Sequence, residues 1–120
     1  MDKKDEKIPK TYYNKLVRDY IPQIIRATGK KPVYRILKDD EYKQALKAKL
    51  LEEVNEFIDA KTNEEMKEEI VDIKQVLSTI IEIFDLKGGL ERMAFNKTIE
   101  KGEFARRYFL ESVEEIDNNI

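Results

Sequence analysis

The sequence predicts an all-α fold, an antiparallel helical bundle whose core is completed by self-association. Charged residues make up 40% of the 120 residues and hydrophobic residues 41%, with only four Gly and three Pro. This composition is typical of helices with solvated outer faces. Apolar residues recur at helical spacing through two long segments, near 40–60 and 62–86. The pair Gly88-Gly89 follows the second segment and marks the end of a helix.

Length, charge and residue types restrict the class of protein. A chain of 120 residues suits one domain, 1–120, with residues 1–11 as a flexible polar tail. The net charge of −2 does not favour nucleic acid as a partner. The chain has no Cys and no His, which excludes disulfides and thiolate metal sites. Neither a signal peptide nor a membrane span is indicated, so we expect a cytoplasmic protein without a membrane partner.

The first predicted elements are short. A helix is expected to begin near Pro22, because proline suits the first helical turn, and to end at Gly29. The following stretch, "KPVYRILKDD" at 31–40, places Val, Tyr and Ile in partial alternation. This pattern favours an extended segment.

Two long helices are predicted next. The first is capped by Asp39 or Asp40 and runs to about Ala60. Thr62 and Glu65 have the spacing of a capping box, which opens the second helix. That helix continues to the glycine pair. Because only two or three residues join the two helices, they should lie antiparallel and side by side.

A further helix is predicted from Leu90 to about Lys101, where Gly102 ends it. The apolar residues beyond it are expected to dock as a strap across the bundle: Phe104, Tyr108, Phe109 and Leu110. The two long helices carry more apolar surface than a helical hairpin can cover. We therefore expect a homodimer or homotetramer.

Each long helix also carries acids at its apolar stripe. On a helical wheel Glu69 falls within the stripe of the second helix, and Asp72 borders it. In the first helix Glu53 borders the stripe, Glu56 lies one turn further on the same side, and Glu52 points further out. Residues at i and i+3 share one helix face. Two antiparallel helices can therefore bring four of these carboxylates to one point.

Four converging carboxylates require either protons or cations. Without His or Cys the ligands are oxygen atoms only, a set that suits Mg²⁺ first and Mn²⁺ next. In the structural alternative the acids are solvated helix faces, and Glu69 pairs with Lys74 or with an Arg of a neighbouring helix. The protein would then be a non-enzymatic helical interaction or scaffold module.

Two motifs resemble a known superfamily. "EEVNE" at 52–56, followed after twelve residues by "EIVD" at 69–72, resembles the EExxE…ExxD signature of the all-α nucleoside triphosphate pyrophosphohydrolases. These include MazG-like and phosphoribosyl-ATP pyrophosphohydrolase-like proteins. The stretch "YNKLVRDYIP" at 13–22 is similar to an N-terminal segment of the same proteins. The resemblance extends over roughly residues 12 to 110.

The resemblance implies Mg²⁺-dependent cleavage between the α- and β-phosphates of a nucleoside triphosphate, which gives a monophosphate and pyrophosphate. It implies a role in removing unwanted nucleotides, with phosphoribosyl-ATP open as a substrate. Glu53, Glu56, Glu69 and Asp72 would hold the metal, and Glu52 would position or deprotonate the attacking water. The cationic candidates for contact with the substrate phosphates are Lys15, Arg18, Lys97, Lys101 and Arg106.

Overall fold

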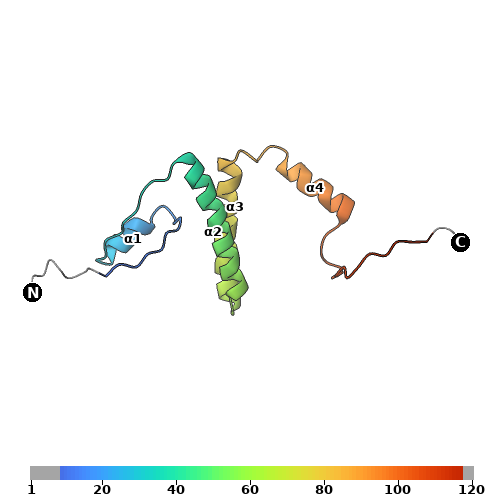
Figure 1. Ribbon diagram of the computed structural model, residues 1–120, viewed down its shortest axis with the longest axis horizontal. Helices are drawn as coiled ribbons and strands as arrows, with labels where there is room; N and C mark the ends of the chain where they lie inside the picture. The colour runs from blue at the N-terminus through green and yellow to red at the C-terminus, as the bar shows by residue number, and fades with distance from the viewer. Residues whose placement is uncertain (1–8, 118–120) are drawn as a thin grey trace, which may run out of the picture. The chain divides into compact units, whose positions relative to one another are not determined.

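The computed structural model describes residues 9–117, which form four α-helices and, within that range, no β-strand (Figure 1). The prediction of an all-α fold is confirmed. The helices are α1 (Ile21–Ala27), α2 (Asp39–Asp59), α3 (Asn63–Ile83) and α4 (Leu90–Lys101). Residues 30–38 connect α1 to α2 without β-pairing, so the partial alternation predicted as extended does not lead to a sheet.

The chain divides into two units, Met1–Leu86 and Lys87–Ile120. The first unit holds α1, α2 and α3, and the second holds α4 with the segment that follows it. A single domain over 1–120 therefore stays a prediction. The expected tail, residues 1–11, lies mostly outside the described residues.

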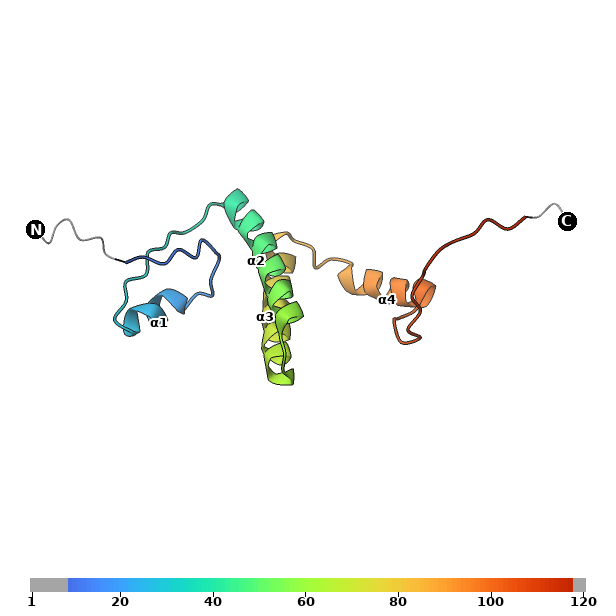
Figure 2. The ribbon, with the colours of Figure 1, turned by 60° about the horizontal axis from the view of Figure 1, so that its bottom comes forward.

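Helices α2 and α3 lie side by side and antiparallel (Figures 1 and 2). The predicted cap opens α3: Thr62 Oγ1 accepts a hydrogen bond from the Glu65 N–H at 3.1 Å. Glu65 Oε2 in turn accepts one from the Lys61 N–H at 2.9 Å. The reciprocal bond thus goes to the residue before the cap, and the two bonds together hold the tight connection between the helices.

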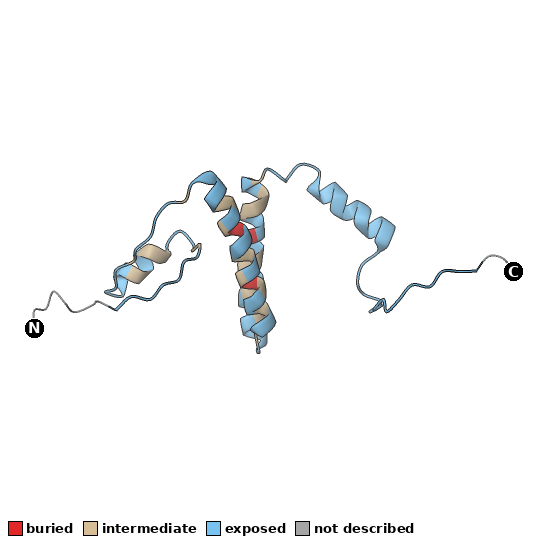
Figure 3. Ribbon diagram, viewed as in Figure 1, coloured by how far each residue is buried: buried red, intermediate tan, exposed pale blue. Residues whose placement is uncertain are grey.

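The buried residues of the described chain lie on this helical pair (Figure 3). They are Leu46 and Glu53 on α2 and Val76 on α3. Large apolar side chains on the same two helices, such as Leu51 and Ile58, remain exposed. The contact between α2 and α3 is therefore narrow, and one of its three buried residues is an acid.

Helix α4 of the second unit has the boundaries that the sequence predicted for it. Helix α4 begins after Gly89 and ends before Gly102, and both glycines adopt the positive φ angles, 75° and 78°, that favour glycine at such turns. The four apolar residues predicted as a strap are exposed. Their docking stays a prediction. Among the described residues, no helix combines the length and apolarity needed to cross a membrane.

Candidate metal centre

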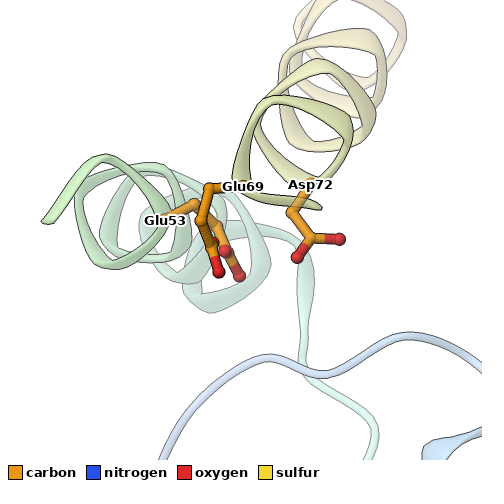
Figure 4. A group of neighbouring side chains, drawn as sticks. All are labelled: Glu53, Glu69 and Asp72. Atoms are coloured by element: carbon orange, nitrogen blue, oxygen red, sulfur yellow. The ribbon is translucent and has the colours of Figure 1, made fainter. Parts of the chain in front are cut away.

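The antiparallel pair brings acids from two separate motifs together. Glu53 of α2 and Glu69 and Asp72 of α3 each offer a carboxylate oxygen, and these oxygens all lie within 4.8 Å of one another. Figure 4 shows the carboxylates of Glu53 and Glu69 adjacent and pointing in the same direction, with Asp72 on the same side of the helices. The i, i+3 spacing on α3 places Glu69 and Asp72 on one face, as the sequence predicts.

Glu53 is the most buried acid of the cluster, with 5% of its surface exposed, while Glu69 and Asp72 are half-buried. The helical wheel placed Glu69 inside the apolar stripe and Glu53 only at its border, so Glu69 was expected to be the more buried of the two. In the structure Glu53 is the more buried. The reason is that a wheel describes one helix alone. The partner helix decides which side of the stripe is covered, and α3 covers the side of α2 that carries Glu53.

Two oxygen atoms in the cluster are left without partners. Glu53 Oε2 and Glu69 Oε2 are buried and receive no hydrogen bond from the described residues. A buried carboxylate oxygen without a donor is costly in free energy. These two atoms therefore need a proton or a cation.

The pKa of Glu69 is raised, so this carboxyl binds a proton more readily than an exposed glutamate does. Burial raises the pKa of the Glu69 carboxyl to about 7. The carboxyls of Glu53 and Glu56 act in the same direction, because a proton on Glu69 can be shared with them in a hydrogen bond and because their negative charges oppose its loss. Burial also raises the pKa of Glu56, and the neighbouring Glu53 adds to this effect, although the hydrogen bond with Glu69 opposes it. The cluster thus holds a proton readily when no cation is bound.

Glu56 lies beside the other acids without joining the group whose oxygens lie within 4.8 Å. Its side chain is exposed at the rim of the cluster. The structure thus brings together three of the four predicted ligands and places the fourth as their neighbour. Glu56 is close enough to Glu53 and Glu69 for the three carboxyls to affect one another's pKa.

Two cations from the N-terminal segment reach the acids. Arg18 Nη2 donates to Asp72 Oδ1 at 2.7 Å, and Lys15 Nζ donates to Glu52 Oε1 at 3.1 Å. Both cations were predicted near the site as phosphate contacts. In the structure their partners are acids far along the chain: Asp72 lies 54 positions after Arg18, and Glu52 lies 37 positions after Lys15.

A third cation, Lys49, was not predicted. Its Nζ lies 3.3 Å from Glu52 Oε1 and 3.2 Å from Glu53 Oε1, and its side chain is only 14% exposed. The sequence carries a signal for it, because Lys49 precedes these two acids by three and four positions on one helix. That spacing is common on solvated helix faces, so it does not stand out until the burial is known.

Glu52 differs from the other acids. Burial raises the pKa of its carboxyl, but the hydrogen bond from Lys15 and the charge of Lys49 outweigh this effect, so that the pKa lies below its usual value. Glu52 is therefore ionised at neutral pH. Its carboxylate contacts Lys15 and Lys49. This agrees with the helical wheel, on which Glu52 points further out than the predicted ligands.

The remaining predicted cations belong to the second unit. Lys97 and Lys101 lie on α4, and Arg106 follows it. Their proposed contact with substrate phosphates stays a prediction.

The ligand atoms of the cluster fit a hard divalent cation. They are all carboxylate oxygens from two packed helices, and the same acids include two buried oxygens that have no hydrogen-bond partner within residues 9–117. Mg²⁺ and Mn²⁺ prefer this type of ligand. Glu53, Glu69 and Asp72 are the residues that would hold such an ion, with Glu56 within reach.

Comparison with known proteins adds a partial match. No family model and no solved structure matches the chain. A protein of Mycolicibacterium smegmatis (strain ATCC 700084 / mc(2)155), described as an uncharacterized protein, is 59% identical over 49 residues. This match covers 41% of the chain and 50% of the relative, so the chain spans about half the relative's length. No activity follows from the similarity.

Proposed function

We propose that this protein is a Mg²⁺-dependent nucleoside triphosphate pyrophosphohydrolase, which cleaves between the α- and β-phosphates to give a monophosphate and pyrophosphate. The removal of unwanted nucleotides from the cellular pool is the role we propose for it. The observation that carries the proposal is the pair of buried, unpartnered oxygens, Glu53 Oε2 and Glu69 Oε2, within a cluster of acids.

This observation favours the metal site over a scaffold. Asp72 and Glu52 have cationic partners, as acids on an ordinary helical surface often do. Glu53 Oε2 and Glu69 Oε2 have none among the described residues, although they are the buried oxygens that most need one. A scaffold has no reason to keep such atoms in its helical contact, since apolar residues there are at least as stabilising.

The reaction class rests on the motifs. "EEVNE" and "EIVD" lie on adjacent antiparallel helices, the arrangement that the resemblance to the pyrophosphohydrolases implies. When bound, Mg²⁺ neutralises charge on the phosphates and makes water a better nucleophile. Glu53, Glu56, Glu69 and Asp72 are the proposed ligands. Glu52 is the proposed residue that orients the attacking water and accepts its proton.

The N-terminal cations, Lys15 and Arg18, are suited to binding the substrate phosphates. Arg18 pairs with Asp72 of the cluster and Lys15 with the neighbouring Glu52, so both cations are already held beside the site. Without nucleotide they stay with these acids. When a nucleotide binds, its phosphates would compete with the two carboxylates for Lys15 and Arg18. Arg suits paired contacts to phosphate oxygens, and Lys acts as a point charge.

We also propose that the protein acts as a homodimer or homotetramer. Leu46 and Val76 are the buried apolar residues of the described chain, whereas Leu51 and Ile58 on α2 and Val71 on α3 are more than half exposed. A second copy would cover this apolar surface and keep water from the helical pair.

The test is an assay of purified protein with each common ribo- and deoxyribonucleoside triphosphate in Mg²⁺, with the products separated by chromatography. We expect monophosphate and pyrophosphate from at least one substrate, and no turnover by Glu69→Gln, which removes a ligand charge at nearly unchanged volume. Diphosphate and phosphate as products would contradict the proposed cleavage position.

A melting experiment separates the enzyme from the scaffold without a substrate. Millimolar Mg²⁺ should raise the melting temperature of the wild type, because the ion binds the folded state only. Glu69→Gln should lose most of this rise while remaining folded. A wild type indifferent to both Mg²⁺ and Mn²⁺ would instead support the scaffold.

A further inference from the structure

Lys49 is the one cation of the cluster that comes from the same helix as the acids it contacts. Its ammonium lies between Glu52 Oε1, at 3.3 Å, and Glu53 Oε1, at 3.2 Å. With 14% of its side chain exposed, it is far less accessible than Lys15, at 38%, or Arg18, at 53%. Lys49 is therefore a fixed part of the site, whereas Lys15 and Arg18 can leave with little cost in burial.

The position of Lys49 divides the oxygens of Glu53 into two sets. Oε1 pairs with the lysine, whereas Oε2 is buried and has no hydrogen-bond partner among the described residues. Oε2 is therefore the oxygen left for a cation that Glu53 would hold together with Glu69 and Asp72. A cation could therefore bind between Glu53 and the acids of α3. The space between Glu53 and Glu52 is already occupied by the ammonium group of Lys49.

The balance of charges around the cluster also favours one divalent cation over two. Five carboxylates lie in the cluster or beside it: those of Glu53, Glu69 and Asp72, with Glu52 and Glu56 as neighbours. Within residues 9–117, three cationic side chains contact these acids, Lys15, Arg18 and Lys49. Two negative charges remain when all the acids are ionised. One divalent cation neutralises them, and a second would leave an excess of positive charge in a half-buried site.

We propose that Lys49 takes the place of a second metal ion, so that each chain binds one divalent cation in the absence of nucleotide, between Glu53, Glu69 and Asp72. This inference rests on the metal site of the proposed function. An ionised carboxylate has two oxygens, so a shared acid such as Glu53 could offer one oxygen to each of two ions. Here the lysine ammonium holds the second oxygen, and it cannot be displaced without burying an unpaired charge.

The test counts bound Mn²⁺, with no nucleotide, by titration calorimetry and by electron paramagnetic resonance of free Mn²⁺ on the full chain. Weak binding to surface acids is subtracted with Glu53→Gln. We expect one Mn²⁺ per chain in the wild type and two in Lys49→Met, the second one near Glu52. Lys49→Arg, which keeps the charge, should remain at one.

The matched control is Lys67→Met. Lys67 pairs with Glu64 at the same i, i+3 spacing, but both side chains are exposed and Glu64 is not one of the three clustered acids. Its count should stay at one. Two Mn²⁺ in the wild type, or one in a folded Lys49→Met, would overturn the inference and leave the proposed function standing. No bound Mn²⁺ in the wild type would overturn the metal site itself. If Lys49→Met does not fold, Lys49→Gln takes its place, because it also removes the charge while keeping a polar side chain; it should bind two Mn²⁺, and a count of one would overturn the inference.

Discussion

At the scale of single residues, the candidate site contains acids whose buried oxygens are not contacted by the neighbouring Lys and Arg side chains of the described chain. Lys15, Lys49 and Arg18 reach Glu52, Glu53 Oε1 and Asp72, whereas Glu53 Oε2 and Glu69 Oε2 lie beyond them. When no cation is bound, Glu69 therefore tends to hold a proton.

The first prediction concerns pH. Burial raises the pKa of Glu69 from 4.5 to about 7, so between these values the folded state binds more protons than the unfolded state. The contribution of Glu69 to stability is therefore fully present below about pH 4.5 and falls as the pH rises through 7. In urea unfolding with EDTA, the wild type should lose stability relative to Glu69→Gln between pH 5 and pH 8. A constant difference between the two proteins would contradict the proton-binding role of Glu69.

The second prediction concerns Arg18. If it contacts the substrate phosphates, Arg18→Ala should lower kcat/KM by about tenfold or more, roughly 1.4 kcal/mol of transition-state stabilisation. Its melting temperature should change little, because the pair with Asp72 is partly exposed, at 53% and 34%. Arg35→Ala is the matched control, since it removes an exposed paired contact, to Glu41, outside the site. Equal kinetics for the two variants would remove Arg18 from the reaction.

At the scale of elements, the start of α3 decides how the acids of α2 and α3 meet. Thr62 and Glu65 stop the chain from continuing as one helix and turn it back within a few residues. The register between α2 and α3, and with it the approach of Glu53 to Glu69, depends on this turn.

Thr62→Ala should therefore destabilise the first unit by about 1 kcal/mol, the usual effect of losing a capping side chain. Thermal and urea unfolding followed by circular dichroism measure it. Thr98→Ala serves as the control, because Thr98 lies inside α4, where its hydroxyl bonds the Ala94 carbonyl and alanine is a better helix former. Equal losses for both variants would show that the cap is unimportant.

At the scale of the whole molecule, the small number of buried residues among those described leads us to predict self-association. Leu51 and Ile58 lie seven positions apart on one face of α2 and are 62% and 69% exposed. Seven positions are close to two helical turns, so a partner could cover both.

Sedimentation velocity should show a dimer or tetramer for the wild type and a smaller species for Ile58→Lys, because a buried lysine opposes the contact. Ile36→Lys is the control. Ile36 is 93% exposed but lies in the connection before α2, outside the paired helices. A wild type that sediments as a monomer would contradict the self-association.

Much of the architecture was determined by the sequence itself. Helix boundaries follow from local chemistry: Pro22 near the start of α1, Thr62 with Glu65 before α3, and the glycines at both ends of α4 act within one or two turns of the chain. The i, i+3 spacing likewise determined that Glu69 and Asp72 share one face of α3.

Only the tertiary structure decided the rest. Glu53, rather than Glu69, is the most buried acid because the partner helix selects which side of an apolar stripe is covered. Lys15 and Arg18 meet acids far along the chain, and no local pattern encodes such contacts. Lys49 has a local signal, but its burial between two acids depends on the packing around α2. Burial and long-range pairing are properties of surfaces in contact, and a one-dimensional pattern describes only the surface that each segment can offer.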